Sequence, residues 1–281
     1  MSSAAPKRFR ASGGSVSGKM KPSHPFIVPE ILRGECAAGA EGQRPLMRLC
    51  LALAGVLTLA PAAVAAERHF ELRIAGLPAA RVTLAADETD GAYAVAARMV
   101  STGFARLLFP LDYEARAEGR RADGGWQPRA YAVEVRRGGE AYRTEMVYER
   151  GTPQVTLQQP PRDWGPQALD PATQADAVDP LTLIHAMLRD VQDADALCRL
   201  DLAMFDSARR AHFSMQGPEA EGGEMVCHAQ YRRVAGYSEA DMARRQAFDL
   251  TFHYRPAADG GFRLAEVRAR SLAGPARLIR R

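Results

Sequence analysis

The side chains best suited to chemistry in this chain are its histidines and cysteines, which stand among many arginines and carboxylates. Five of the six histidines follow residue 66, and none has a matching acid and nucleophile within a few residues: His69, His185, His212, His228 and His253. The sequence contains no glycine-rich phosphate loop, no nucleophile elbow and no histidine pair at metal-binding spacing on a predicted helix. These patterns predict a protein that is not an enzyme and that holds no cofactor or metal.

One histidine, His185, falls on the apolar face of a predicted helix. Such a residue is either a packed, hydrogen-bonded core histidine or a catalyst, and the pattern favours the packed residue. Acid pairs such as Asp193 with Asp195 occur in turn-like stretches that are typical of solvated surface. A hydrolase assembled from residues far apart in the sequence is a remote alternative.

Two cysteines, Cys198 and Cys227, lie beyond the first 66 residues. In an oxidising compartment two cysteines most simply form one disulfide. This bond would close a loop of about 30 residues and add on the order of 3 kcal/mol to the free energy of unfolding. A metal site with His212 and His228 is the alternative, but adjacent residues 227 and 228 point to opposite faces of a strand.

The charged residues argue against one class of partner. Residues 1–66 hold eight of the 37 basic and three of the 33 acidic residues, which leaves 29 arginines against 30 acids. This near-neutral balance predicts no nucleic-acid partner. Neighbouring arginines such as Arg232 and Arg233 are interpreted as charges that protect strand edges from pairing. Alternatively, the arginine of a pair that points into the barrel could bind an anionic head group.

A secretory signal peptide is predicted over residues 47–66. Arg48 precedes a 12-residue apolar stretch, and Ala63–Ala65 forms a small-x-small cleavage site. The apolar run ends at Pro61, short of the ~20 residues needed to cross a bilayer, so no transmembrane anchor is expected after cleavage. The product is therefore expected in the periplasm.

The remaining chain divides into two parts. Residues 1–46 are rich in Ser, Gly, Pro and Ala without hydrophobic periodicity, which predicts a disordered extension or a mis-assigned start. Residues 67–281 are predicted to form a single β-rich domain. Alternation of apolar and polar residues at period two predicts these strands: 70–74, 81–84, 93–96, 111–121, 127–137, 140–150, 153–158, 198–206, 209–217, 224–234, 245–255 and 261–271.

About a dozen strands are too many for a small flat layer, so the fold class is predicted as mainly β, an antiparallel meander curled into a closed or open barrel. One helix is expected over residues 180–191. Asp179 suits its N-cap and Pro180 its first turn, where a missing N–H costs nothing. The helix would cover one end of the barrel or fill its middle.

The stretch Ser101–Pro110 is apolar without alternation. It is interpreted as a short helix or crossing loop, either a lid over an apolar cavity or, as the pattern favours, ordinary closure of the core. The side chains expected to line an interior cavity, if the barrel holds one, are Leu107, Phe109, Phe248 and Phe252.

Several structural motifs follow one another in the second half: Asp179-Pro180-Leu181-Thr182, then Cys198, the turn around Phe205–Arg210, and Cys227 leading into Tyr231–Tyr237. In this order the chain resembles the DUF3108 family of exported proteobacterial proteins, in the branch with this cysteine pair. Ser207 stands where the family's turn usually has glycine. The resemblance implies a periplasmic, β-rich envelope protein of unassigned function, and it implies no active-site residues.

Two functions remain open at this point. The first is a non-enzymatic envelope protein that binds a lipid-like or amphipathic ligand inside the barrel. The second is an interaction scaffold with a filled core that binds another envelope protein or the cell wall. The first requires an elongated interior cavity, whereas the second requires solid packing at the same positions.

Overall fold

The computed structural model describes residues 66–122, 125–271 and 274–281. The predicted extension over 1–46 and the predicted signal peptide over 47–66 lie outside the described residues, except for Ala66. All described strands belong to one 14-stranded sheet. No helix in the described ranges is long and apolar enough to cross a membrane.

The strands of the first half are β1 Ala66–Ile74, β2 Leu77–Thr89, β3 Ala92–Ser101, β4 Leu111–Ala122, β5 Gly125–Arg137, β6 Glu140–Glu149 and β7 Thr152–Gln159. Those of the second half are β8 Ala177–Val178, β9 Asp201–Phe205, β10 Arg210–Glu221, β11 Glu224–Ala235, β12 Ala247–Pro256, β13 Phe262–Ser271 and β14 Gly274–Arg280. The helices are α1 Gly103–Leu108, α2 Pro180–Leu188 and α3 Glu239–Arg244, with 3₁₀ turns η1 Pro171–Thr173 and η2 Ala194–Ala196.

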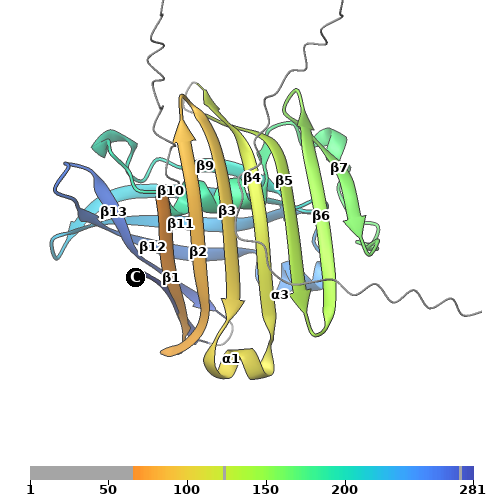
Figure 1. Ribbon diagram of the computed structural model, residues 1–281, viewed down its shortest axis with the longest axis horizontal. Helices are drawn as coiled ribbons and strands as arrows, with labels where there is room; N and C mark the ends of the chain where they lie inside the picture. The colour runs from red at the N-terminus through yellow and green to blue at the C-terminus, as the bar shows by residue number, and fades with distance from the viewer. Residues whose placement is uncertain (1–65, 123–124, 272–273) are drawn as a thin grey trace, which may run out of the picture. The chain divides into compact units, whose positions relative to one another are not determined.

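The sheet is two meanders joined edge to edge. Strands β1 to β7 pair in sequence order, β9 to β14 do the same, and β1 pairs with β14 to join the two halves. Strands β7 and β8 are left as the two edges, so the barrel is nearly closed with one seam. Figure 1 shows β1 to β7 as one upright wall and β9 to β13 crossing behind it. The predicted β-rich barrel is confirmed.

Tight turns set the register of the first meander. The turn between β2 and β3 consists of Asp90 and Gly91, both with positive φ (51° and 75°), which is the backbone that a two-residue hairpin needs. Gly138 and Gly139 make the corresponding turn between β5 and β6, also with positive φ.

Helix α2 lies between the two walls and fills the interior. It contacts β3, β4, β5 and β9, and it appears in Figure 1 as the green helix behind the front wall. Six of its nine residues are buried, among them Leu181, Leu183 and Leu188. The facing wall carries small buried residues, Ala97 and Ala115, which pair across β3 and β4. Small side chains there leave room for a helix inside the barrel.

A chain of buried hydrogen bonds ties α2 to the wall. The Asp179 carboxylate accepts from the backbone N–H groups of Leu181 (2.9 Å) and Thr182 (2.8 Å), which confirms the predicted N-cap. Its second oxygen accepts from the Thr182 hydroxyl at 2.6 Å, and that hydroxyl lies 2.9 Å from the Tyr93 hydroxyl on β3. Gly119 makes this reach possible, because a Cβ there would lie 2.5 Å from the Tyr93 hydroxyl oxygen.

The sulfur atoms of Cys198 and Cys227 lie at disulfide-bonding distance, with Cα atoms 5.3 Å apart. Both side chains are buried in the core. Cys198 lies just before β9 and Cys227 on β11, so the pair clamps the start of the second meander across β10.

Two of the four residues predicted to line a cavity, Leu107 and Phe109, do not lie in the interior. Leu107 on α1 and Phe109 after it are 79% and 64% exposed, because α1 lies outside the barrel end and no residue of it is buried. The segment 101–110 therefore neither covers a cavity nor closes the core. Phe252 is fully buried but packed against Phe213, with ring centroids 6.0 Å apart. Phe248 is part-buried between Arg233 and Arg245, and its ring lies 6.1 Å from that of Tyr231.

Several other elements also differ from the predictions, and three of these differences matter here. The predicted helix over 180–191 ends at Leu188, where Arg189 turns to extended backbone. The short helix α3 and the last strand β14 were not predicted. Strand β14 is the element that pairs with β1 and joins the two meanders.

Replacing both Cys198 and Cys227 by Ala is expected to lower the free energy of unfolding by about 3 kcal/mol, since the cross-link restricts the unfolded chain. Urea unfolding followed by circular dichroism measures the change. Reductant should lower the stability of the parent and leave that of the double variant unchanged. Equal stability of parent and variant in oxidising buffer would contradict this expectation.

Burial raises the pKa of the Asp179 carboxyl from its ordinary 3.8 to about 6. An acid whose pKa is higher in the folded state contributes stability at low pH and loses it as pH rises, here between about 4 and 6. The Asp179→Asn variant keeps a capping oxygen and does not titrate. We therefore expect the stability of the parent, relative to this variant, to fall across that window.

Chemical unfolding at several pH values tests this expectation, and a difference that stays constant from pH 4 to 6 would exclude it. The variant Asp179→Ala should lower the free energy of unfolding by about 2–4 kcal/mol, because the cap is lost and buried donors lose their acceptor. The matched control is Ser238→Ala, which removes the N-cap of the more exposed α3 and should cost only about 1 kcal/mol.

Candidate ligand-binding site

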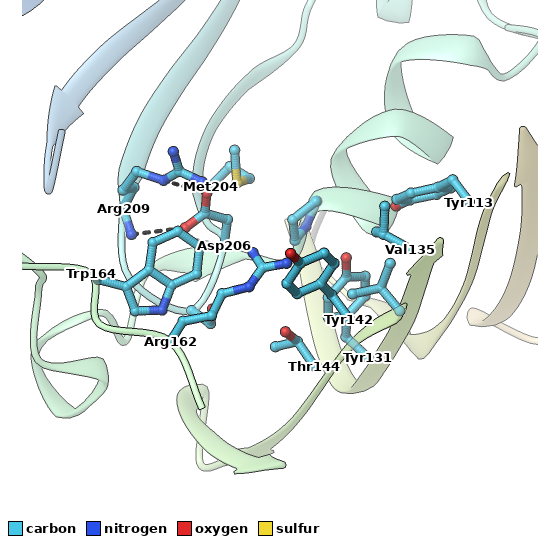
Figure 2. Close-up of a pocket in the computed structure, with 13 residues that line it drawn as sticks. Tyr113, Tyr131, Val135, Tyr142, Thr144, Arg162, Trp164, Met204, Asp206 and Arg209 are labelled. Carbon is cyan, nitrogen blue, oxygen red and sulfur yellow. Dashed lines mark hydrogen bonds and ion pairs between the residues drawn. The ribbon is translucent and has the colours of Figure 1, made fainter. Parts of the chain in front are cut away.

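A pocket of about 300 Å³ lies where the first meander meets the second, near the seam. We call it the seam pocket. Strands β4 to β6 form one side, and β9, the β9–β10 turn, the connector after β7 and the start of α2 form the other (Figure 2). Its lining residues are Tyr113, Tyr131, Val133, Val135, Tyr142, Thr144, Arg162, Trp164, Pro180, Met204, Asp206, Ser207 and Arg209.

The inner wall is aromatic and uncharged. Burial raises the pKa of Tyr113 to about 12 and that of Tyr131 well above its ordinary value of 10. Both phenols therefore keep their protons at neutral pH. Together with Val133 and Met204 they offer a ligand apolar contact and polar but neutral hydroxyls.

Hydrogen-bond donors without acceptors line the outer side. Trp164 Nε1 and Ser207 Oγ are buried and have no partner among the described residues. Buried donors nearly always find an acceptor in a native protein, so the acceptors for these two come from water or from a ligand. Arg162 adds a guanidinium 4.3 Å from the Tyr142 ring centroid and 5.2 Å from that of Trp164, with no carboxylate within ion-pair distance in the described chain.

The one carboxylate of the pocket is already compensated. Asp206 accepts from the backbone N–H and the Nε of Arg209, at 2.8 and 2.9 Å. The uncompensated charge is therefore that of Arg162. Ser207 has φ of +89°, a conformation that favours glycine, which gives the physical reason for the glycine expected after the aspartate.

Arginines and aromatic rings alternate beyond the pocket. We call this row the arginine–aromatic stack, and it runs Tyr142, Arg162, Trp164, Arg209, Tyr237, Arg233, Phe248, Arg245, with guanidinium-to-centroid distances of 4.3 to 5.4 Å. It passes from β6 through the connector to the β9–β10 turn, β11 and β12. Each such contact contributes about 0.5–1 kcal/mol at exposed sites, so the row holds the two meanders together beside the seam.

The motif Tyr231–Tyr237 has a structural role next to the pocket. Gly236 has φ of +84°, and a Cβ there would lie 2.5 Å from the Ala208 carbonyl oxygen. The end of β11 therefore packs directly on the β9–β10 turn. The Tyr231 and Tyr237 hydroxyls lie 3.2 Å apart, and Arg233 donates to the carbonyls of Asp241 and Arg245 around α3.

His185 belongs to a second buried cluster. Its side chain is fully buried, and its Nε2 lies 2.9 Å from Glu88 Oε1 on β2. This contact lowers the pKa of Glu88 to about 2, while burial lowers the pKa of His185. Trp126 packs against the imidazole edge-on at 5.4 Å. His185 has the enclosed surroundings of a packed core histidine.

The other histidines are separate from one another. His212 Nε2 lies 2.9 Å from Asp201, and His228 lies 3.5 Å from Glu219, both on the outer surface. Within the part of the chain that the structure describes, no three His, Cys, Asp or Glu side chains are grouped to hold a metal ion.

The sequence prediction missed the pocket. None of the four residues expected in a cavity lines it. Arg162 and Trp164 lie in the connector after β7, where no helix or strand was predicted, and Ser207 with Arg209 lie in a predicted turn. The available signal was one arginine and one tryptophan, Arg162 and Trp164, in a connector that holds no other residue of either kind.

Comparisons with known proteins give a family and one structural likeness. Two chains among solved structures match, one of which is a β-barrel-like protein of domain of unknown function DUF1849 from Brucella abortus. It is 14% identical, with a TM-score of 0.48, and the match covers 78% of this chain and 96% of that one. No curated protein matches. Residues 69–221 match the sequence model of DUF3108, a family of unknown function. Because this match spans more than half of the 281 residues, the chain belongs to the DUF3108 family.

Proposed function

We propose that this protein is a non-enzymatic, periplasmic component of the cell envelope that binds a small amphipathic ligand in the seam pocket. The observation that carries the proposal is the meeting of an apolar, tyrosine-rich wall with Arg162 and two donors that lack acceptors. A ligand that satisfies all of them has an apolar segment and an anionic group with acceptor oxygens, such as a carboxylate or phosphate.

The volume of the pocket limits the size of this ligand. Binding sites for small molecules usually measure about 300–1,000 Å³, and this pocket is at the lower end. It would take a head group or one short acyl chain, and it is too small for a two-chain lipid. The ligand would lie at the wall of the barrel, because α2 occupies the middle.

A second candidate function is the filled-core interaction scaffold. The observation in its favour is that α2 is mostly buried in the interior and that Phe252, predicted to line a cavity, is fully buried against Phe213. Such a protein would act only through its surface. Ligand titration separates the two functions.

Decanoate is expected to bind the parent protein in isothermal titration calorimetry, while decanol and decyltrimethylammonium bind more weakly. The variant Arg162→Gln should weaken decanoate binding about tenfold, because one charge-assisted hydrogen bond is lost. It should leave decanol binding nearly unchanged. Arg116→Gln is the matched control, since Arg116 is an exposed arginine on β4 without an ion pair in the described chain.

Absence of decanoate binding, together with a native mass that shows no co-purified small molecule, would favour the scaffold. An equal loss of decanoate affinity in the Arg162 and Arg116 variants would show a general charge effect and contradict a binding site at the seam.

The periplasmic location rests on the signal-like sequence over 47–66, and the buried cysteine pair supports it, since disulfides persist in oxidising compartments. Fractionation of cells that express the full chain should recover it in the periplasm. Sequencing should give a mature N-terminus at Ala66 or Glu67. Recovery in the cytoplasm with an intact leader would reject this location and leave the ligand site untouched.

A further inference from the structure

Large apolar side chains gather on the surface at one end of the barrel. In the described residues, seven large hydrophobic side chains are exposed, and five of them lie together. We call these five the apolar tip: Leu77 at the start of β2, and Phe104, Leu107, Leu108 and Phe109 in and after α1. Each is 56% to 79% exposed. The other two, Val147 and Val234, are single residues on β6 and β11.

The fold holds these side chains outward. Phe104, Leu107 and Leu108 are spaced i, i+3, i+4, so they share one face of α1, and no residue of this helix is buried. The backbone N–H of Thr102 donates to the Ala79 carbonyl at 2.9 Å, which fixes the start of α1 beside β2. In Figure 1, α1 crosses beyond the ends of β3 and β4. The apolar tip is therefore a projection rather than a groove.

The charge of the tip has one sign. The segments 74–81 and 100–110, which carry it, contain Arg81 and Arg106 and no acidic residue. Both arginines are exposed and have no ion pair in the described chain. Asp112, the first acid after α1, lies 3.4 Å from Arg98 and 3.9 Å from Arg136 and is thus compensated.

We propose that the apolar tip inserts into the surface of a bilayer that contains anionic lipids. Apolar and aromatic side chains that enter the head-group region, with arginines beside them that reach lipid phosphates, are the ordinary means of interfacial binding. A bilayer needs no matching concave surface, whereas a protein partner for a convex tip does. This membrane contact does not depend on ligand binding at the seam pocket.

The test uses residues 66–281, which contain the whole sheet and its core. The vesicles are extruded from phosphatidylethanolamine with about 30% phosphatidylglycerol, which gives an anionic surface. Flotation should recover the parent with these vesicles. The variant Leu107→Ser/Phe109→Ser should bind about tenfold more weakly, because two exposed side chains no longer leave water. Both residues are outside the core, so circular dichroism should remain unchanged.

The matched control is Val147→Ser/Val234→Ser, which removes the two exposed apolar side chains outside the tip and should bind like the parent. Arg81→Gln/Arg106→Gln should also weaken binding, by about tenfold, and should reduce its dependence on salt. Phosphatidylcholine vesicles should retain less of the parent than the anionic vesicles do.

Three results would overturn the proposal: no flotation of the parent, equal flotation of the tip variant, or equal loss in the control variant. Sedimentation velocity tests whether the tip instead binds a second copy of this chain. A dimer of the parent that the tip variant abolishes would assign the tip to self-association and reject the membrane contact.

Discussion

The buried cap of α2 is the interaction on which the barrel depends. A 14-stranded sheet with only one seam encloses a volume that side chains from the walls alone do not fill, and here a helix occupies it. A helix end inside a core must satisfy its free N–H groups without water, and the Asp179 carboxylate does so. Through Thr182 it also reaches Tyr93 on the wall. One carboxylate thus fixes where α2 begins and which strand it faces.

Local chemistry explains what the sequence could predict. Alternation at period two identified most strands, and the Asp179-Pro180 pair identified the start of the helix, because both signals come from neighbouring residues. Asp90-Gly91 likewise marked its hairpin turn. The closure between β1 and β14 depends on residues more than 190 positions apart in the chain, and nothing local to Gly274–Arg280 identifies that partner.

The errors share a physical cause. The stripe of Phe104, Leu107 and Leu108 is the pattern of a core-facing helix, and sequence alone does not say which side of a helix meets water. The seam pocket could not be foreseen for a related reason. Its residues come from β4 to β6, the connector and the β9–β10 turn, and only the curling of the sheet brings Arg162 and Ser207 together.

The arginine–aromatic stack has a mechanical consequence. Elsewhere around the barrel, backbone ladders join neighbouring strands, and a ladder loses its hydrogen bonds when strands slip by even part of a residue. Flat guanidinium groups and rings keep most of their attraction when they slide over one another. Among the described strands, the barrel lacks a backbone ladder at the seam between β7 and β8, and beside this seam the stack supplies contacts that tolerate sliding.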